Sequence, residues 1–301
     1  MQNWLKTQIP TAVILLAILV IGIVLTGTGQ MTPAMDTPAL TATRGVILAI
    51  VGLLAGFLGG IIGTGGCSVM LPVLHFWMGY PAPIAVGTTL FAVIFTAISG
   101  GYGHLLRRNL DKRAVAWLGG AGILGVLIGS WLFTFLSSQS ALLGLILGLL
   151  FLWPALRMIW EGIRQAGYPQ KEGNQISAPA TGLALFGLIV GMATGIAGLG
   201  GGYALVPGLI YLFGAPVYIT MGTSLATMIP LALVGGSLKL AGGFVHLSTG
   251  LILAAGTMIG AQIGAAMIKR FKPATLKLIF GLYFLYVSVK FMAAFFGIKV
   301  W

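Results

Sequence analysis

Long apolar stretches separated by short polar breaks run through most of this chain. After a polar segment at residues 26–43, the stretches fall into two sets of five, and none of them alternates with a period of two. This pattern favours helices over the strands of a barrel. Several stretches contain about 18 or more apolar residues, the length that a helix needs to cross a bilayer. The first set is residues 45–63, 66–78, 83–105, 114–136 and 140–160, and the second is 180–198, 201–213, 218–240, 247–268 and 275–297.

The second stretch of each set is short and begins at a glycine cluster. Residues 56–72 read GFLGGIIGTGGCSVMLP and residues 191–207 read GMATGIAGLGGGYALVP; they align without a gap at an offset of 135 residues, as from Pro72 to Pro207. About 13 residues are too few for a full span. We therefore predict, in both halves, a helix and a half-helix that turn at the glycines inside the bilayer. Paired breaks of this kind point to the binding site of a transporter.

The expected fold is an all-α polytopic membrane protein with two inverted repeats of about five helical segments, with broken or re-entrant helices. We expect an N-terminal transmembrane helix and linker at residues 1–43, repeat 1 at 44–160, a linker at 161–178 and repeat 2 at 179–301. The first apolar segment follows Lys6, and we expect it to be retained rather than cleaved as a signal peptide.

Basic residues predict the orientation of the two halves. In the first half they gather after the third stretch, at residues 107–113, whereas in the second half they gather after the fourth, at 269–277. Cytoplasmic loops carry an excess of Lys and Arg. Equivalent loops then lie on opposite sides of the membrane, which makes the repeats inverted. We expect the protein in the inner membrane of the cell. The linker and the N-terminus are expected on its cytoplasmic side, and the C-terminus on the periplasmic or extracellular side.

Composition excludes several classes of protein. The chain is 58% hydrophobic and 7% charged, so it cannot cover a water-facing surface. Its net charge of +12 is spread over loops, so we expect no nucleic-acid partner. The single cysteine excludes an internal disulfide or a thiolate metal cluster. We expect no cofactor, no metal and no enzymatic activity, because all the acidic residues are expected in loops, away from the core. They are Asp36, Asp111, Glu161 and Glu172.

The glycine clusters and the hydroxyl groups near them are the candidate site. Glycine leaves backbone N–H groups uncovered, and a helix start attracts anions. The alternatives are that the glycines serve close helix packing and that the hydroxyl groups bond to carbonyls of their own helices. The candidate substrate-binding residues are Gly63, Thr64, Gly65, Gly66, Cys67, Ser68, Thr88, Thr89, Gly198, Gly200, Gly201, Gly202, Tyr203, Thr223 and Ser224.

Two further residues are candidates for a proton or anion role. His75 lies in the first half-helix, and Lys239 lies towards the end of the third stretch of the second half, at the position equivalent to His104. Ionisable groups within membrane segments are functional candidates. We expect His104 and Lys239 near the membrane edges, where a long side chain can reach water.

The paired motifs GxxGxGG…P and GT[TS]L resemble those of the TauE/SafE sulfite exporter family, also called TSUP. The resemblance covers residues 45–297, and one departure is Cys67, where the second half keeps Gly202. The family resemblance implies an inner-membrane permease for small sulfur-containing anions such as sulfite and organosulfonates. It assigns no catalytic residue.

We therefore expect a membrane transporter that works as an exporter. Its expected partners are a small anionic substrate and the lipid bilayer, and a homodimer is left open. The alternatives are a carboxylate permease, an anion channel, a membrane-embedded enzyme and an assembly subunit. The enzyme needs convergent titratable groups, which the sequence does not provide.

Overall fold

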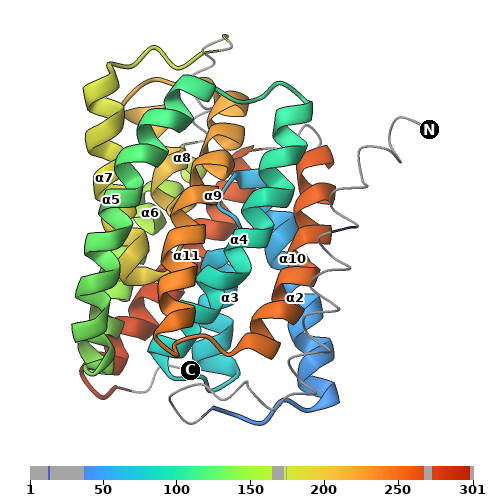
Figure 1. Ribbon diagram of the computed structural model, residues 1–301, viewed down its shortest axis with the longest axis vertical. Coiled ribbons are helices and arrows are strands. Elements are labelled where there is room, and N and C mark those ends of the chain that lie inside the picture. Colours follow the sequence, from blue (N-terminus) through green and yellow to red (C-terminus); the bar gives the residue numbers. More distant parts are fainter. Residues whose placement is uncertain (1–12, 14–36, 165–172, 174, 268–272, 299–301) are drawn as a thin grey trace.

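The computed structural model describes residues 13, 37–164, 173, 175–267 and 273–298, and these form a bundle of helices (Figure 1). The expected first helix, part of the linker and the loop at 268–272 lie outside the described residues. The helices are α2 Ala42–Ile62, α3 Cys67–Pro72, the π-helix η1 Val73–Trp77, α4 Ala82–Leu106, α5 Lys112–Ser137, α6 Ser140–Ile163, α7 Ala180–Ala197, α8 Gly202–Tyr211, α9 Val217–Ala241, α10 Leu247–Met267 and α11 Pro273–Phe295.

The ten predicted stretches correspond to these helices, and seven described helices are long and apolar enough to cross a membrane. The prediction of an all-α polytopic fold is therefore confirmed. Both predicted breaks are present as well. α2 ends at Gly63 with φ of 82°, and α7 ends at Gly198 with φ of 66°. These left-handed conformations suit glycine, because it lacks the Cβ that would clash.

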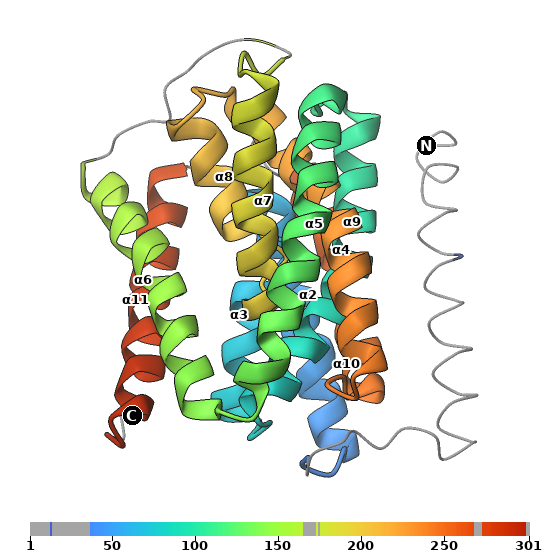
Figure 2. The same cartoon turned by 60° about the vertical axis from the view of Figure 1, so that its left-hand side comes forward.

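Equivalent helices of the two halves run in opposite directions. A Cβ on Gly100 of α4 would touch Leu225 of α9, whereas one on Gly235 of α9 would touch Leu90 of α4, so these helices are antiparallel. α6 and α11 are antiparallel by the same test. The α2–α3 hairpin lies in the lower half of Figure 2 and the α7–α8 hairpin in the upper half.

The halves also exchange partners. α2 of the first half packs in parallel along α10 of the second, and α7 of the second packs in parallel along α5 of the first. Glycines make both contacts possible, because a Cβ on any of them would collide with the backbone of the facing helix. They recur at every fourth residue of α2 and α7, as Gly52, Gly56 and Gly60 and as Gly187, Gly191 and Gly195.

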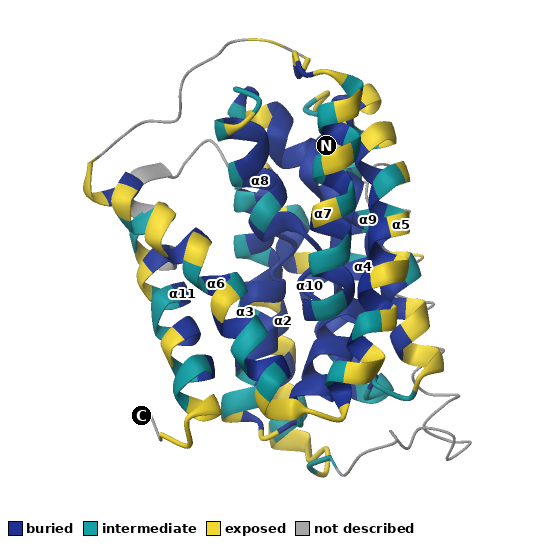
Figure 3. Cartoon of the chain, turned by 90° about the vertical axis from the view of Figure 1, so that its left-hand side faces the viewer, coloured by how far each residue is buried: buried dark blue, intermediate teal, exposed yellow. Residues whose placement is uncertain are grey.

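Burial follows from this arrangement. α4, α8, α9 and α10 are mostly buried in the interior, whereas α5, α6 and α7 each turn one exposed face outward (Figure 3). The exposed side chains of those faces are largely apolar, such as Leu124, Trp131, Leu149 and Leu185. Apolar residues that face outward over the length of a helix are what lipid contact requires.

The α5–α7 contact should be sensitive to a single methyl group. Gly191→Ala places a Cβ against the carbonyl of Gly122 and forces the helices apart. Overpacking of this kind costs about 1–3 kcal/mol, so we expect a lower midpoint of thermal unfolding for the purified protein. Gly120→Ala on α5 is the matched control, because a Cβ there meets nothing within 4 Å. Equal midpoints for the two variants would contradict this packing.

Candidate functional site

The two glycine breaks meet in the interior of the bundle. A Cβ on Gly65 would lie 2.5 Å from Met228 Cε, and one on Gly200 would lie 2.6 Å from the same atom. Both would also contact Val93 Cγ1. Val93 on α4 and Met228 on α9 are themselves equivalent positions, so each break packs against the same matched pair of side chains.

Cys67 joins the two breaks. Its thiol is buried and lies 2.5 Å from Leu199 O in the other half and 3.2 Å from Thr64 O in its own turn. At the equivalent position, a Cβ on Gly202 would lie only 2.6 Å from Thr64 Cα. The Cys67 side chain therefore fills a contact at the start of α3, while the start of α8 is formed by bare backbone.

The hydroxyl groups predicted for the site divide into two groups. Ser224 lies at the breaks, where its Oγ donates to Gly63 O at 2.9 Å, and the equivalent Thr89 Oγ1 is buried with no hydrogen-bond partner among the described residues. Thr64, Ser68 and Tyr203 are buried beside the same turns.

Thr88 and Thr223 instead hold loops. Thr223 Oγ1 accepts from Asp111 N–H at 3.0 Å, and Thr88 Oγ1 accepts from His246 N–H at 2.9 Å. Asp111 and His246 are equivalent residues just before α5 and α10. Burial lowers the pKa of His246, so its ring is neutral at pH 7, and Nδ1 accepts from Thr249 N–H at 3.3 Å. Within the described part of the chain, neither threonine hydroxyl bonds to a carbonyl of its own helix, which was the alternative that the sequence suggested.

His75 lies apart from the breaks. It belongs to η1, where its Nδ1 lies 2.9 Å from Tyr80 O and its ring stacks on Phe291 with centroids 5.4 Å apart. Phe76 and Trp77 extend the same aromatic group towards α11. The structure gives His75 a structural environment at the end of the first half-helix.

Lys239 and His104 lie close to the ends of α9 and α4, but both side chains are buried inside the protein, so the expectation that they reach water is wrong. Lys239 is 1% exposed; its Nζ lies 2.5 Å from Gly195 O and 3.9 Å from the centre of the Phe133 ring. His104 is also fully buried, with Nε2 at 3.4 Å from Gly60 O. Both side chains point into the protein because each contacts a carbonyl in the last turn of a broken helix. His104 contacts Gly60 O of α2, and Lys239 contacts Gly195 O of α7.

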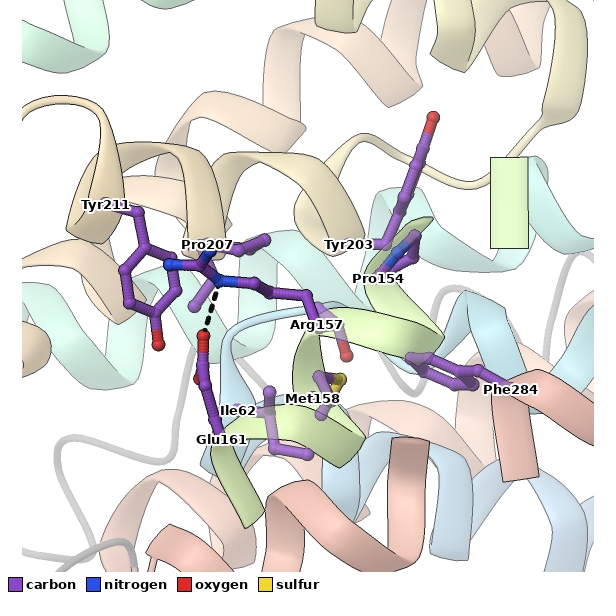
Figure 4. A pocket seen from close by; sticks show the side chains of 11 residues that line it. Ile62, Pro154, Arg157, Met158, Glu161, Tyr203, Pro207, Tyr211 and Phe284 are labelled. Carbon is purple, nitrogen blue, oxygen red and sulfur yellow. Dashed lines mark hydrogen bonds and ion pairs between the residues drawn. The ribbon is translucent and has the colours of Figure 1, made fainter. Parts of the chain in front are cut away.

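A small pocket lies beside the breaks, between α6, α8 and α11 (Figure 4). Thr64 and Tyr203 belong to its lining, so it reaches the turns on which the prediction rested. Most of the other lining residues are apolar, namely Ile62, Pro154, Met158, Val206, Pro207 and Phe284.

The charged groups of this cavity are Arg157 and Glu161 of α6, and neither was predicted from the sequence to lie there. Arg157 Nε lies 2.8 Å from Glu161 Oε1, and the guanidinium stacks 4.1 Å from the centre of the Tyr211 ring. The prediction that Glu161 lies in a loop is wrong, because α6 continues to Ile163 and buries this carboxylate. The sequence held one signal for this pair. Arg157 and Glu161 are four residues apart, a spacing that places an acid and a base on the same face of a helix.

Bundled apolar helices, interrupted at mid-bundle beside a cavity, are the architecture of a multi-pass membrane transporter. The family model described as "Sulfite exporter TauE/SafE" matches residues 47–291, and the chain belongs to this family. No solved structure gives a significant match.

Curated relatives carry the corresponding general name. "Probable membrane transporter protein YdhB" of Bacillus subtilis is 28% identical over 77% of this chain and 94% of its own length. YunE of the same organism, named in the same way, is 28% identical over 78% of this chain and 92% of its own length. A "probable membrane transporter protein" of Haemophilus influenzae is 25% identical over 81% and 96%. The family and these relatives establish a membrane transporter.

Thr223→Val should test the loop-holding role. The change leaves the buried N–H of Asp111 without its acceptor, which costs about 1–3 kcal/mol, and we expect a clear loss of thermal stability. Thr220→Val is the matched control on α9, because Thr220 Oγ1 is equally buried and has no hydrogen-bond partner among the described residues. Removing the Thr220 hydroxyl group should leave the thermal stability unchanged or raise it. The reverse order of stabilities would show that the Thr223 bond does not hold this loop.

Proposed function

We propose that this protein is an inner-membrane exporter of small sulfur-containing anions such as sulfite or organosulfonates. The observation that carries the proposal is the cavity beside the two breaks, which presents one guanidinium group in an apolar wall. Family membership supports the substrate class, since the family is described as that of a sulfite exporter. Transport rather than catalysis is the activity that this arrangement supports.

Arg157 is the group that would attract the anion. Its guanidinium offers planar donors suited to a sulfur oxyanion, and Tyr211 holds it by stacking. In the structure Glu161 takes the place of a substrate at Nε. An anion that displaces this carboxylate would then lie against Thr64, where the cavity meets the first break.

The two halves act in this proposal as inverted repeats around the breaks. The antiparallel α4–α9 and α6–α11 pairs support this relation. The basic loop before α5 is tied to the segment before α7, since Ile176 N–H donates to Asp111 Oδ2 at 2.7 Å and Arg113 Nη2 donates to Ala178 O at 3.3 Å. The basic loop before α5 and the segment before α7 therefore share one face of the bundle, which we propose is cytoplasmic.

Removing the guanidinium should weaken transport. In proteoliposomes loaded with sulfite, we expect Arg157→Gln to raise KM for efflux by about tenfold or more, the effect of losing a charge-assisted hydrogen bond. The double variant Arg157→Gln/Glu161→Gln should show the same rise, because it leaves no unpaired carboxylate.

Arg164→Gln is the control, since Arg164 is exposed at the end of α6 and stacks on Trp160. A wild-type KM for both the single and the double variant would show that Arg157 does not bind the anion and that the site lies elsewhere. Lactate and sulfate as competing substrates would separate a carboxylate permease from a sulfur-anion carrier, and non-saturating efflux would indicate a channel.

Two equivalent positions test the inverted arrangement. Leu106 and Ala241 end α4 and α9, and both are exposed. We expect Leu106→Cys to react with an impermeant maleimide only from the cytoplasmic face, and Ala241→Cys only from the opposite face. The native Cys67 is buried and serves as a silent background. Labelling of both positions from one face would contradict inverted repeats.

A further inference from the structure

The amino group of Lys239 is buried, and the proposed anion route through the cavity does not use it. No carboxylate lies within salt-bridge distance of it in the part of the chain that the structure describes; its partners are Gly195 O and the Phe133 ring. An unpaired ammonium is costly inside a protein within a membrane. A position this costly needs an explanation beyond packing.

The contact of Lys239 has an equivalent in the first half. Gly60 and Gly195 are equivalent residues in the last turns of α2 and α7, and His104 and Lys239 are equivalent residues of α4 and α9. Carbonyl groups in the last turn of a helix have no donor within that helix. In each half, therefore, a nitrogen from the third helical segment covers a carbonyl directly before the break.

The charge of Lys239 matters because of where α7 ends. The carboxyl end of a helix carries roughly half a negative charge, and here that end lies next to the start of α8. A negative helix end would repel an anion that approaches Gly200 and Gly201. The ammonium group at Gly195 O offsets that repulsion, and in the interior its field is weakly screened.

We propose that Lys239 is a positioning residue that sets the charge preference of the transport site. Its amino group holds the end of α7 at Gly195 O, and in its protonated form it places a positive charge beside the second break, so that the site favours anions of higher charge. This inference rests on the proposed function, because it presumes that an anion reaches the breaks.

Two substitutions separate the charge from the hydrogen bond. Lys239→Met removes both, whereas Lys239→Gln removes the charge and keeps an N–H donor for Gly195 O. The probes are methanesulfonate and methanedisulfonate, which carry one and two fixed negative charges on the same head group. Their dissociation constants would be measured by thermal shift on the purified full-length protein, with monodisperse elution showing that each variant is folded.

We expect both variants to lower the preference for methanedisulfonate over methanesulfonate, measured as the ratio of the two dissociation constants, by roughly tenfold. The reason is that the positive charge of Lys239 attracts each negative charge of the substrate, so its loss weakens binding of the dianion more than that of the monoanion. Lys290→Met is the matched control; Lys290 lies over the rings of Phe76, Trp77 and Tyr286, away from α7. Its preference should equal that of the wild type.

Three results would overturn the proposal. A wild-type preference in Lys239→Gln with a changed one in Lys239→Met would show that only the hydrogen bond matters. An unchanged preference in both variants, or an equal loss in Lys290→Met, would show that Lys239 does not set it. If the wild type binds neither probe, nor sulfite, the proposed function itself fails, which the first two results leave intact.

Discussion

Backbone groups inside a bilayer must find their hydrogen-bond partners within the protein, and this constraint governs the whole centre of the molecule. Each broken helix leaves carbonyl groups in the interior without a donor from its own helix. Ser224 donates to Gly63 O, Lys239 to Gly195 O and the Cys67 thiol to Leu199 O. The breaks are therefore stable because side chains from other segments cover them, and those side chains also fix the positions of the helix starts that face the cavity.

Glycine is the second requirement of this arrangement, because the turns and the close helix contacts need a residue without a side chain. It allows the left-handed turns at Gly63 and Gly198, and along α2 and α7 it lets neighbouring backbones touch. The packing role expected for glycine is therefore present, while anion binding by the turn glycines stays a prediction. Those of the helices serve packing, and those of the turns bring the two halves into contact around Val93 and Met228.

Much of the fold could be predicted from the sequence because apolar length and glycine position are local signals. The breaks, the short half-helices and the order of the segments follow from them. Side-chain partners are not local. Lys239 was expected to reach water because the sequence does not show that α7 ends beside it. Glu161 was assigned to a loop because its charge marked the limit of an apolar stretch, and Arg157 was missed in the cavity because the approach of α8 is set only by the tertiary fold.

The exchange of partners between halves has a consequence for biosynthesis. α2 meets the glycine surface of α10, yet α10 begins only at Leu247, after the first half and most of the second have been made. Until then α2 must remain in lipid with its row of glycines uncovered, held by the translocon, a chaperone or a weaker temporary neighbour. A ribosome that stalls between the halves would leave a fragment whose helices are inserted but whose interior cannot close. Quality control in the membrane would therefore act on the first half as an unfinished protein, however well each of its helices spans.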